Sequence, residues 1–273
     1  MVKVLGIGDN VVDKYVHIKT MYPGGNALNF SVFAKKLGME AAFIGTFGDD
    51  KEAEHVEKVL KELKIDLSHC RHFSGENGCA RVTLEDGDRV FLGSNAGGVT
   101  RENPFVLTDG DIEYIKGFSL MHTGLYSHTG HILEQLSTLG VPLSFDFSDD
   151  FQQEEIEQYI SYVDYAFFSC SHLSHEETEQ LLESNHRKAG QILVATRGSD
   201  SAIAFDGAKY YYQEPEYVKA VDTMGAGDSF ITAFLLHLLN EKDIASSIKE
   251  SAAFAAKSCL VEGSFGYGVQ YHE

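Results

Sequence analysis

The sequence has few basic residues and no long apolar run. Its 22 lysine and arginine residues stand against 41 aspartate and glutamate residues, giving a formal net charge of −19. Nucleic acids and anionic membrane surfaces require a basic face, so this balance argues against both as partners, whereas backbone amides and a few local cations can still hold an anionic small ligand. No stretch approaches the roughly 18 consecutive apolar residues of a membrane span. We therefore expect a protein that binds neither nucleic acid nor membrane.

Disulfide and targeting signals are also lacking. The four cysteines, Cys70, Cys79, Cys170 and Cys259, form no CxxC pair and no spacing typical of a disulfide framework. The first ten residues, MVKVLGIGDN, run into a strand-like segment without the h-region and cleavage site of a signal peptide. Reduced thiols are ordinary in the cytoplasm, so we expect a cytoplasmic location.

What the sequence does contain is an alternation of short apolar runs with amphipathic helical patterns. This alternation is typical of an α/β fold, a mostly parallel sheet flanked by helices. The length of 273 residues and the 43% hydrophobic content fit a single domain over residues 1–273, without linker or repeat. The candidate strands are Val4–Gly8, Ala42–Phe47, Ser119–Gly124, Leu143–Phe147, Ala166–Ser169 and Ile192–Thr196.

Two segments break this alternation and predict a small β-lid. Lys14–Met21 is a short strand-like piece soon after the first candidate strand, and Ala80–Leu92 contains two strand patterns around Asp86-Gly87, a strong hairpin signal. Open α/β sheets bind ligands at the carboxyl ends of their strands, so β-structure at that edge would cover the ligand.

The most specific segment is VDTMGAGDSF, residues 221–230, directly before a long apolar helix expected from about Asp228 to Leu239. Gly225, Ala226 and Gly227 are small residues at the start of this helix. Small residues there leave several N–H groups free to converge on one point, with the helix dipole behind them. The pattern therefore predicts an anion hole with Asp228 beside it.

An anion hole and a carboxylate are the parts that phosphoryl transfer needs. Fixed amide donors stabilise charge that develops on the transferred group, and a carboxylate accepts the proton of the attacking hydroxyl. For GAGD alone, an ordinary glycine loop with an aspartate cap is the better interpretation. The ten-residue string with its apolar helix favours a catalytic role for Asp228.

These motifs resemble those of the ribokinase/PfkB family of carbohydrate kinases. DTMGAGDSF is similar to the family's C-terminal signature, whose last aspartate is the catalytic base, and three further segments match in order. They are Gly24-Gly25-Asn26-Ala27-Leu28-Asn29, Gly45-Thr46-Phe47-Gly48-Asp49-Asp50 and Thr196-Arg197-Gly198-Ser199-Asp200-Ser201. The resemblance implies a ribokinase-like fold, ATP as phosphoryl donor, Mg²⁺, a sugar as acceptor, and activation by a monovalent cation in some members.

The resemblance also assigns binding residues. Asp13, Gly24, Gly25 and Asn29 would bind the sugar, with Asp9 and Asn10 as weaker candidates. Thr196, Gly198 and Ser199 would bind the nucleotide. Without the resemblance, Asp13 would be interpreted as a solvated loop aspartate.

One departure from the family pattern concerns the metal. The family carries an NxxE stretch that helps position Mg²⁺, whereas this chain has SCSHLSHEETE from Ser169 to Glu179, without asparagine. Glu176 or Glu177 could substitute, so no metal ligand is assigned. The missing asparagine leaves open a catalytically weak sugar- or nucleotide-binding protein on the same fold. A dinucleotide oxidoreductase is disfavoured because the GxGxxG pattern fails at Val11.

Within the family, the sequence most resembles the fructoselysine 6-kinases. The resemblance lies in GDNVVDKY, GGNALNFSV, the hairpin around Asp86-Gly87, FDFSD at 145–149, and the histidines His122 and His128. Acidic residues such as Asp9 and Asp13 suit an ammonium-bearing substrate, and Arg89 could meet its carboxylate unless it is simply solvated. Another fructosamine, fructose or ribose remain alternatives. Because lid edges pair between subunits in this family, a homodimer through Ala80–Leu92 is also expected.

Overall fold

The computed structural model describes residues 2–85 and 88–272, without the side chains of residues 84–89. Its main sheet has nine strands in the order β13-β12-β11-β10-β9-β8-β1-β4-β5. The run from β11 to β5 is parallel throughout, and β12 and β13 add an antiparallel edge. The strands are β1 (Lys3–Gly8), β4 (Glu40–Phe47), β5 (Arg71–His72), β8 (Leu120–Gly124), β9 (Leu143–Asp146), β10 (Tyr165–Ser169), β11 (Ile192–Arg197), β12 (Asp200–Phe205) and β13 (Tyr210–Gln213).

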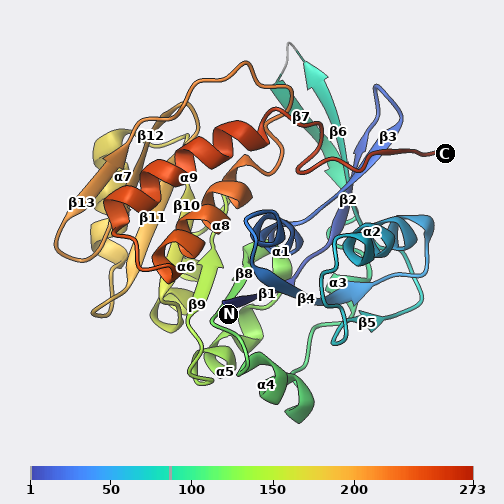
Figure 1. Ribbon diagram of the computed structural model, residues 1–273, viewed down its shortest axis with the longest axis horizontal. Helices are drawn as coiled ribbons and strands as arrows, with labels where there is room; N and C mark the ends of the chain where they lie inside the picture. Colours follow the sequence, from blue (N-terminus) through green and yellow to red (C-terminus); the bar gives the residue numbers. More distant parts are fainter. Residues whose placement is uncertain (1, 86–87, 273) are drawn as a thin grey trace.

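Helices cover both faces of this sheet, which confirms the α/β prediction (Figure 1). The longer helices are α1 (Asn26–Lys36), α2 (Lys51–Glu62), α7 (His175–Asn185), α8 (Ala226–Leu239) and α9 (Ile244–Ser258). The shorter ones are α3 (Val99–Glu102), α4 (Asp109–Ile115), α5 (Leu133–Ser137), α6 (Gln153–Tyr159), and the 3-10 turns Leu125–Ser127, Gly130–Ile132 and Ile160–Tyr162. One core contains side chains of α1, α8 and α9, and another contains side chains of α4, α5, α6 and α7.

A second, five-stranded sheet forms the lid, in the order β14-β3-β2-β6-β7. Its strands are β2 (Val11–Tyr15), β3 (Thr20–Gly24), β6 (Gly78–Glu85), β7 (Asp88–Ser94) and β14 (Val269–Gln270). Figure 1 shows β6 and β7 projecting away from the main sheet. The lid therefore joins segments from both ends of the chain and from its first third.

The lid boundaries differ from the expected ones. The piece expected at Lys14–Met21 is two antiparallel strands, β2 and β3, because the chain turns back between Tyr15 and Thr20. Lys19 adopts a φ of 49° in that turn. The hairpin expected in Ala80–Leu92 lies in β6 and β7, whereas its Asp86-Gly87 turn lies outside the described residues.

The cysteines and the helices bear on two expectations from the sequence, that there is no disulfide framework and no membrane span. All four cysteines are free thiols. Within residues 2–85 and 88–272, no helix has both the length and the apolar character needed to cross a bilayer.

Candidate active site

Functional side chains gather where β1, β8 and β9 end and where α1 and α8 begin. These three strands are parallel neighbours, so their carboxyl ends lie at one edge of the sheet. Asp9 follows β1, Asp146 ends β9, and Asn26 and Asp228 lie in the first turns of α1 and α8. Segments more than 200 residues apart in the sequence thus meet at the carboxyl edge of the sheet, where open α/β sheets bind their ligands.

Asp228 is held by two asparagine amides. Its Oδ1 accepts a hydrogen bond from Asn26 Nδ2 at 2.8 Å, and its Oδ2 accepts one from Asn29 Nδ2 at 2.5 Å. Both donors lie on α1, which fixes the direction of the carboxylate relative to the sheet edge. The structure therefore brings two predicted site residues, Asp228 and Asn29, into direct contact.

The start of α8 provides backbone donors beside this carboxylate. Gly225 is the N-cap with a φ of 72°, and a Cβ there would lie 2.7 Å from the Cβ of Ser264, so glycine is required on both counts. The Ala226 N–H donates to the Thr223 carbonyl at 3.2 Å. The N–H groups of Gly225 and Gly227 donate no hydrogen bond to the described part of the chain. Two of the three predicted anion-hole amides are thus available to a ligand.

Asp222 anchors the loop before α8, a role that no sequence motif indicated. The residue is 2% exposed, and its carboxylate accepts hydrogen bonds from the Met224 N–H at 2.9 Å, the Gly263 N–H at 2.9 Å and the Tyr15 hydroxyl at 2.5 Å. Tyr15 belongs to β2, so one carboxylate ties the lid to the loop before α8.

Asp146 is a second buried carboxylate that no sequence motif singled out as a site residue. Its Oδ2 accepts a hydrogen bond from Asn26 Nδ2 at 2.9 Å, so one amide group bridges Asp146 and Asp228. Burial, and then the charges of Asp228 and Asp9, raise the pKa of Asp146 to about 7. The available signal was its position: an aspartate at the end of an apolar strand, like Asp9.

The carboxylate of Asp9 forms hydrogen bonds with other groups of the protein. Its Oδ1 accepts hydrogen bonds from the Ser127 hydroxyl at 2.6 Å and the Ala27 N–H at 3.1 Å, and its Oδ2 accepts one from the Asn26 N–H at 2.7 Å. These bonds satisfy orphan donors at the start of α1. Asp9 therefore anchors α1 at the site, and its predicted contact with substrate stays a prediction.

The predicted sugar residues lie on the lid side of the same site. Asp13 in β2 is 4% exposed, and a Cβ on Gly24 would lie 2.5 Å from its Oδ2, so the glycine makes room for the carboxylate. The Oδ1 atoms of Asn29 and Asn10 are buried and have no hydrogen-bond partner among the described residues. Buried polar atoms are normally paired, so both oxygens are acceptors suited to ligand hydroxyls. Arg89 lies in β7, with its side chain outside the described part.

The predicted nucleotide residues lie farther along the same edge. Thr196 is near the carboxyl end of β11, and Gly198 and Ser199 form the exposed turn to β12, where Gly198 has a φ of 64°. β10, β9 and β8 separate β11 from β1 in the sheet. The predicted nucleotide site and the predicted sugar site therefore lie at the same edge of the main sheet. They are separate along that edge, so the phosphoryl donor and the acceptor can each have a binding site.

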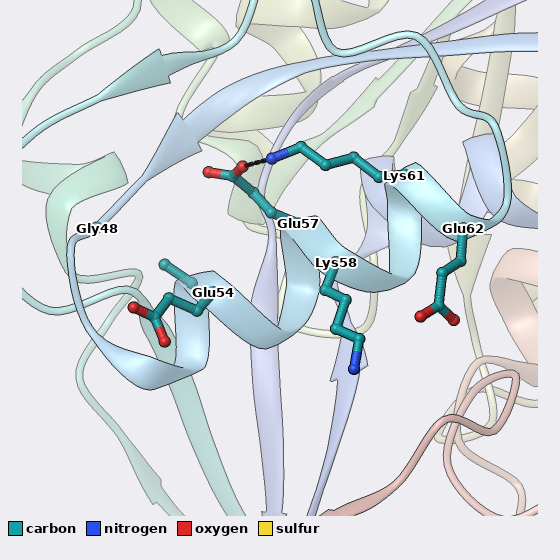
Figure 2. Close-up of a pocket in the computed structure, with 7 residues that line it drawn as sticks. Gly48, Glu54, Glu57, Lys58, Lys61 and Glu62 are labelled. Carbon is teal, nitrogen blue, oxygen red and sulfur yellow. Dashed lines mark hydrogen bonds and ion pairs between the residues drawn. The ribbon is translucent and has the colours of Figure 1, made fainter.

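Neither of two surface hollows contains these residues. One, of about 590 Å³, lies on α2, and Figure 2 shows the charged side chains that line it, including the Glu57–Lys61 ion pair. The other, of about 510 Å³, lies between the lid and the start of α2. The candidate site is therefore recognised by its converging polar side chains and backbone amides, and neither of these two hollows marks it.

Comparison with known proteins identifies the family. Residues 3–266 match the model of the pfkB family carbohydrate kinases. The chain belongs to this family. It is 43% identical to "Fructosamine kinase FrlD" of Bacillus subtilis over 270 residues, covering 98% of this chain and 95% of that protein. It is 32% identical to "Fructoselysine 6-kinase" of Escherichia coli over 259 residues, covering 95% and 98%.

Solved structures agree on the fold of this carbohydrate kinase. Arabidopsis thaliana ribokinase, complexed with ribose and ATP, superposes with a TM-score of 0.82 at 18% identity, over 97% of this chain and 95% of that one. A putative ribokinase II from E. coli, in complex with ATP and Mg²⁺, gives a TM-score of 0.79 at 19% identity with the same coverage. The fold is therefore ribokinase-like, and the enzyme is an ATP-dependent sugar kinase.

The described part of the chain presents no preformed metal cage. Within the described residues, no group of three or more histidine, cysteine, aspartate or glutamate side chains could hold a metal ion. Glu177, a candidate substitute for the family's metal-positioning residue, instead accepts a hydrogen bond from the Ser174 N–H at 2.8 Å in the capping box of α7. Mg²⁺ in kinases is bound largely by substrate phosphates and water, which needs no such cage.

Proposed function

We propose that this kinase transfers the γ-phosphoryl group of MgATP to the 6-hydroxyl of fructoselysine, with Asp228 as the catalytic base. The observation that carries the proposal is the position of Asp228, held by Asn26 and Asn29 beside the available amides of Gly225 and Gly227. Similarity to a fructosamine kinase and a fructoselysine 6-kinase over nearly the whole chain supports the choice of acceptor.

In the proposed reaction, the sugar 6-oxygen attacks the γ-phosphorus while its proton passes to Asp228. A new P–O bond forms, the bond between the γ-phosphorus and the bridging oxygen breaks, and ADP leaves. The amides of Gly225 and Gly227, with the α8 dipole behind them, stabilise the charge on the transferred group. Mg²⁺ bound to the nucleotide would neutralise charge on the phosphates.

The acceptor sugar would lie between α1 and the lid. The unpartnered Oδ1 atoms of Asn29 and Asn10 would accept hydrogen bonds from its hydroxyls, and Asp13 would accept others. Gly24 and Gly25 allow the lid backbone to approach closely. Thr196, Gly198 and Ser199 would contact the nucleotide, and Arg89 would meet the carboxylate of the lysine moiety.

The charge of the site favours an acceptor that carries a cation. Asp146 feels the charges of both Asp228 and Asp9 strongly enough that they contribute to its raised pKa. An ammonium group, which fructosamines carry and fructose and ribose lack, would be attracted by this negative charge. We therefore rank fructosamines above fructose and ribose as acceptors.

A panel of acceptors tests this proposal. ADP release is measured with MgATP and fructoselysine, a second fructosamine, fructose and ribose, and the phosphorylated carbon is located by NMR. Fructoselysine should give the highest kcat/KM, with phosphate at carbon 6. A higher kcat/KM for fructose, or phosphate on another carbon, contradicts the proposal. Repeating the assay with and without K⁺ tests the monovalent-cation activation implied by the family resemblance.

A catalytically weak sugar- or nucleotide-binding protein on the same fold is the second candidate. It is favoured by the stretch from Ser169 to Glu179, which contains no asparagine and whose Glu177 caps a helix. Calorimetry separates the two candidates: this alternative predicts sugar and nucleotide binding without ADP release for any acceptor, whereas the kinase proposal predicts both.

We also propose a homodimer through the lid. β7 is the edge strand of the lid sheet, and Phe91 and Leu92 on it are 59% and 53% exposed. An edge strand with exposed apolar side chains is a template for pairing with a second chain. Sedimentation at micromolar concentration should show a dimer that Leu92→Asp converts to monomer. Val106→Asp, at a 66% exposed position away from the lid, should leave the dimer intact. A monomeric wild type contradicts the proposal.

A further inference from the structure

The amide of Asn26 has a single orientation that satisfies its neighbours. One end of the side chain faces the carboxylates of Asp228 and Asp146, at 2.8 and 2.9 Å, and the other end lies 3.0 Å from Nε2 of His122. The ionised carboxylate of Asp228 only accepts hydrogen bonds, so the amide nitrogen must face it and the amide oxygen must face His122. The amide oxygen of Asn26 therefore needs a hydrogen-bond donor at His122.

His122 can be that donor in only one protonation state. The ring is 0% exposed on β8, and burial lowers its pKa to about 3, so it is neutral. A neutral imidazole has one N–H. Because Nε2 faces an amide oxygen, the proton is on Nε2, and Nδ1 accepts the hydroxyl of Ser144 on β9 at 2.9 Å.

Two further contacts fix this arrangement. The ring of Phe30 on α1 lies 4.7 Å from that of His122, centroid to centroid, and limits rotation of the imidazole. Gly124 leaves the space that the amide oxygen of Asn26 occupies, because a Cβ on Gly124 would lie 2.7 Å from that oxygen. Gly124 therefore gives the amide of Asn26 room beside His122.

We propose that His122 is a positioning residue for the catalytic base, acting through Asn26. Donation runs from the Ser144 hydroxyl to His122 Nδ1, from His122 Nε2 to the Asn26 oxygen, and from the Asn26 nitrogen to Asp228. Without the donor at His122, the amide oxygen of Asn26 loses its partner and the amide is held from one end only, which loosens its hydrogen bond to the base and misaligns the base. This proposal rests on the proposed role of Asp228 as the base.

The charges around the base stay the same when His122 changes. Asp228 on α8 contacts the neutral amides of Asn26 and Asn29 on α1, and its charge acts on Asp146 at the end of β9. Loss of the neutral imidazole therefore alters hydrogen-bond donation to the base without altering charge. Fewer donors disfavour the ionised carboxylate and shift the acid limb of activity to higher pH.

The test compares His122→Leu, which removes the donor, with His122→Gln, whose amide nitrogen can replace Nε2. His122→Leu should lower kcat about 10- to 100-fold, as expected for a misaligned base, with little change in the KM for ATP. It should also move the acid limb of the pH profile of kcat/KM to higher pH. His122→Gln should recover most of both. A folded His122→Leu variant with wild-type kcat and pH profile would overturn the proposal.

A second measurement does not depend on how the variants fold or on activity. Long-range proton–nitrogen NMR of the wild-type protein should show His122 neutral at pH 6, with its proton on Nε2. A proton on Nδ1, or a charged ring, overturns the positioning role. If the wild type phosphorylates no acceptor while this tautomer is observed, the proposed function fails and the arrangement of His122 and Asn26 stands.

Discussion

At the scale of single residues, the site is a set of carboxylates held apart by amides. Asn26 donates to Asp228 and Asp146 with one nitrogen, and Asn29 donates to Asp228 with another. Like charges this close disfavour simultaneous ionisation. Burial and then the charges of these neighbours raise the pKa of Asp146.

The raised pKa of Asp146 predicts a pH-dependent stability. The carboxyl group keeps its proton up to about pH 7 in the folded protein but loses it near 3.8 when unfolded, so between these values the folded state binds more protons. The free energy of unfolding therefore falls as pH rises through this window. Asp146→Asn cannot ionise. The substrate-free variant should melt about 5 °C above wild type at pH 8 and about equally at pH 4.

Thermal denaturation of wild type, Asp146→Asn and the exposed control Asp150→Asn across pH 4–8 checks this prediction. Asp150→Asn should follow wild type at every pH. An Asp146→Asn variant that is less stable than wild type at pH 8 would contradict the prediction, because it would show that the ionised carboxylate stabilises the fold.

At the scale of elements, the two glycines at the start of α8, Gly225 and Gly227, are expected to have different roles, one in stability and one in function. Gly225 has a positive φ and no room for a Cβ, whereas a Cβ on Gly227 would meet no atom within 4 Å. The first glycine is therefore needed for the fold. The second is needed only if something else occupies the open space beside it.

Gly225→Ala and Gly227→Ala form a matched pair. Gly225→Ala should lower the melting temperature, because it adds a clash with Ser264 at a left-handed position. Gly227→Ala should keep or raise the melting temperature, since alanine is the better helix former by about 1 kcal/mol. It should nevertheless lower kcat/KM for ATP at least tenfold, because the methyl group fills the space proposed for the transferred phosphoryl group. Melting curves and steady-state kinetics of both variants check this, and unchanged kinetics in Gly227→Ala would contradict the anion hole.

At the scale of the whole molecule, the lid and the loop before α8 are tied together. The Tyr15 hydroxyl on β2 donates to Asp222 at 2.5 Å, and Asp222 also holds the backbone of Met224 and Gly263. Packing supports the same link, because Tyr15, Tyr22, Val82 and Met224 form one buried cluster. The positions of the lid and of the loop before α8 are thus mechanically connected.

Tyr15→Phe tests this connection. It removes a hydrogen bond to a charged group and should lower the free energy of unfolding by about 2 kcal/mol. The KM for the acceptor should rise several-fold, because the lid is less firmly held, while kcat changes less. Tyr267→Phe, at a 41% exposed ring, is the control. Denaturant unfolding and kinetics measure both effects, and an unchanged KM in a destabilised Tyr15→Phe would show that this bond serves the fold alone.

Much of the fold could be predicted from local pattern, because every parallel strand buried on both faces is an apolar run. Each candidate strand corresponds to a strand of the main sheet, within two residues at either end. The lid was less predictable: β3 pairs with β14 near the C-terminus, and a turn inside an eight-residue segment carries no distinct signal. Local sequence pattern therefore predicts whether a segment forms a strand better than it predicts which other segment that strand pairs with.

The same limit applied to the candidate site: local motifs pointed to some residues, whereas long-range contacts gave other residues their roles. Asp228, Asn29 and the glycines of α8 stand in strings specific enough to be recognised singly. Asn26, Asp146 and Asp222 stand in quoted strings as well but were assigned no role, because their roles arise from contacts with residues 120, 202 or 207 positions away. His122 was predicted only through resemblance, and its burial against Asn26 gives it a physical role.

The role of Asp228 as base of a sugar kinase is tested most directly by a single comparison. ADP release with MgATP and fructoselysine is measured for wild type, Asp228→Asn and Asp150→Asn, alongside calorimetric titration with ATP. Asp228→Asn should lose about 100- to 10,000-fold in kcat while binding ATP nearly as tightly as wild type, and Asp150→Asn should match wild type. Turnover by Asp228→Asn within a few-fold of wild type would contradict the assignment of the base.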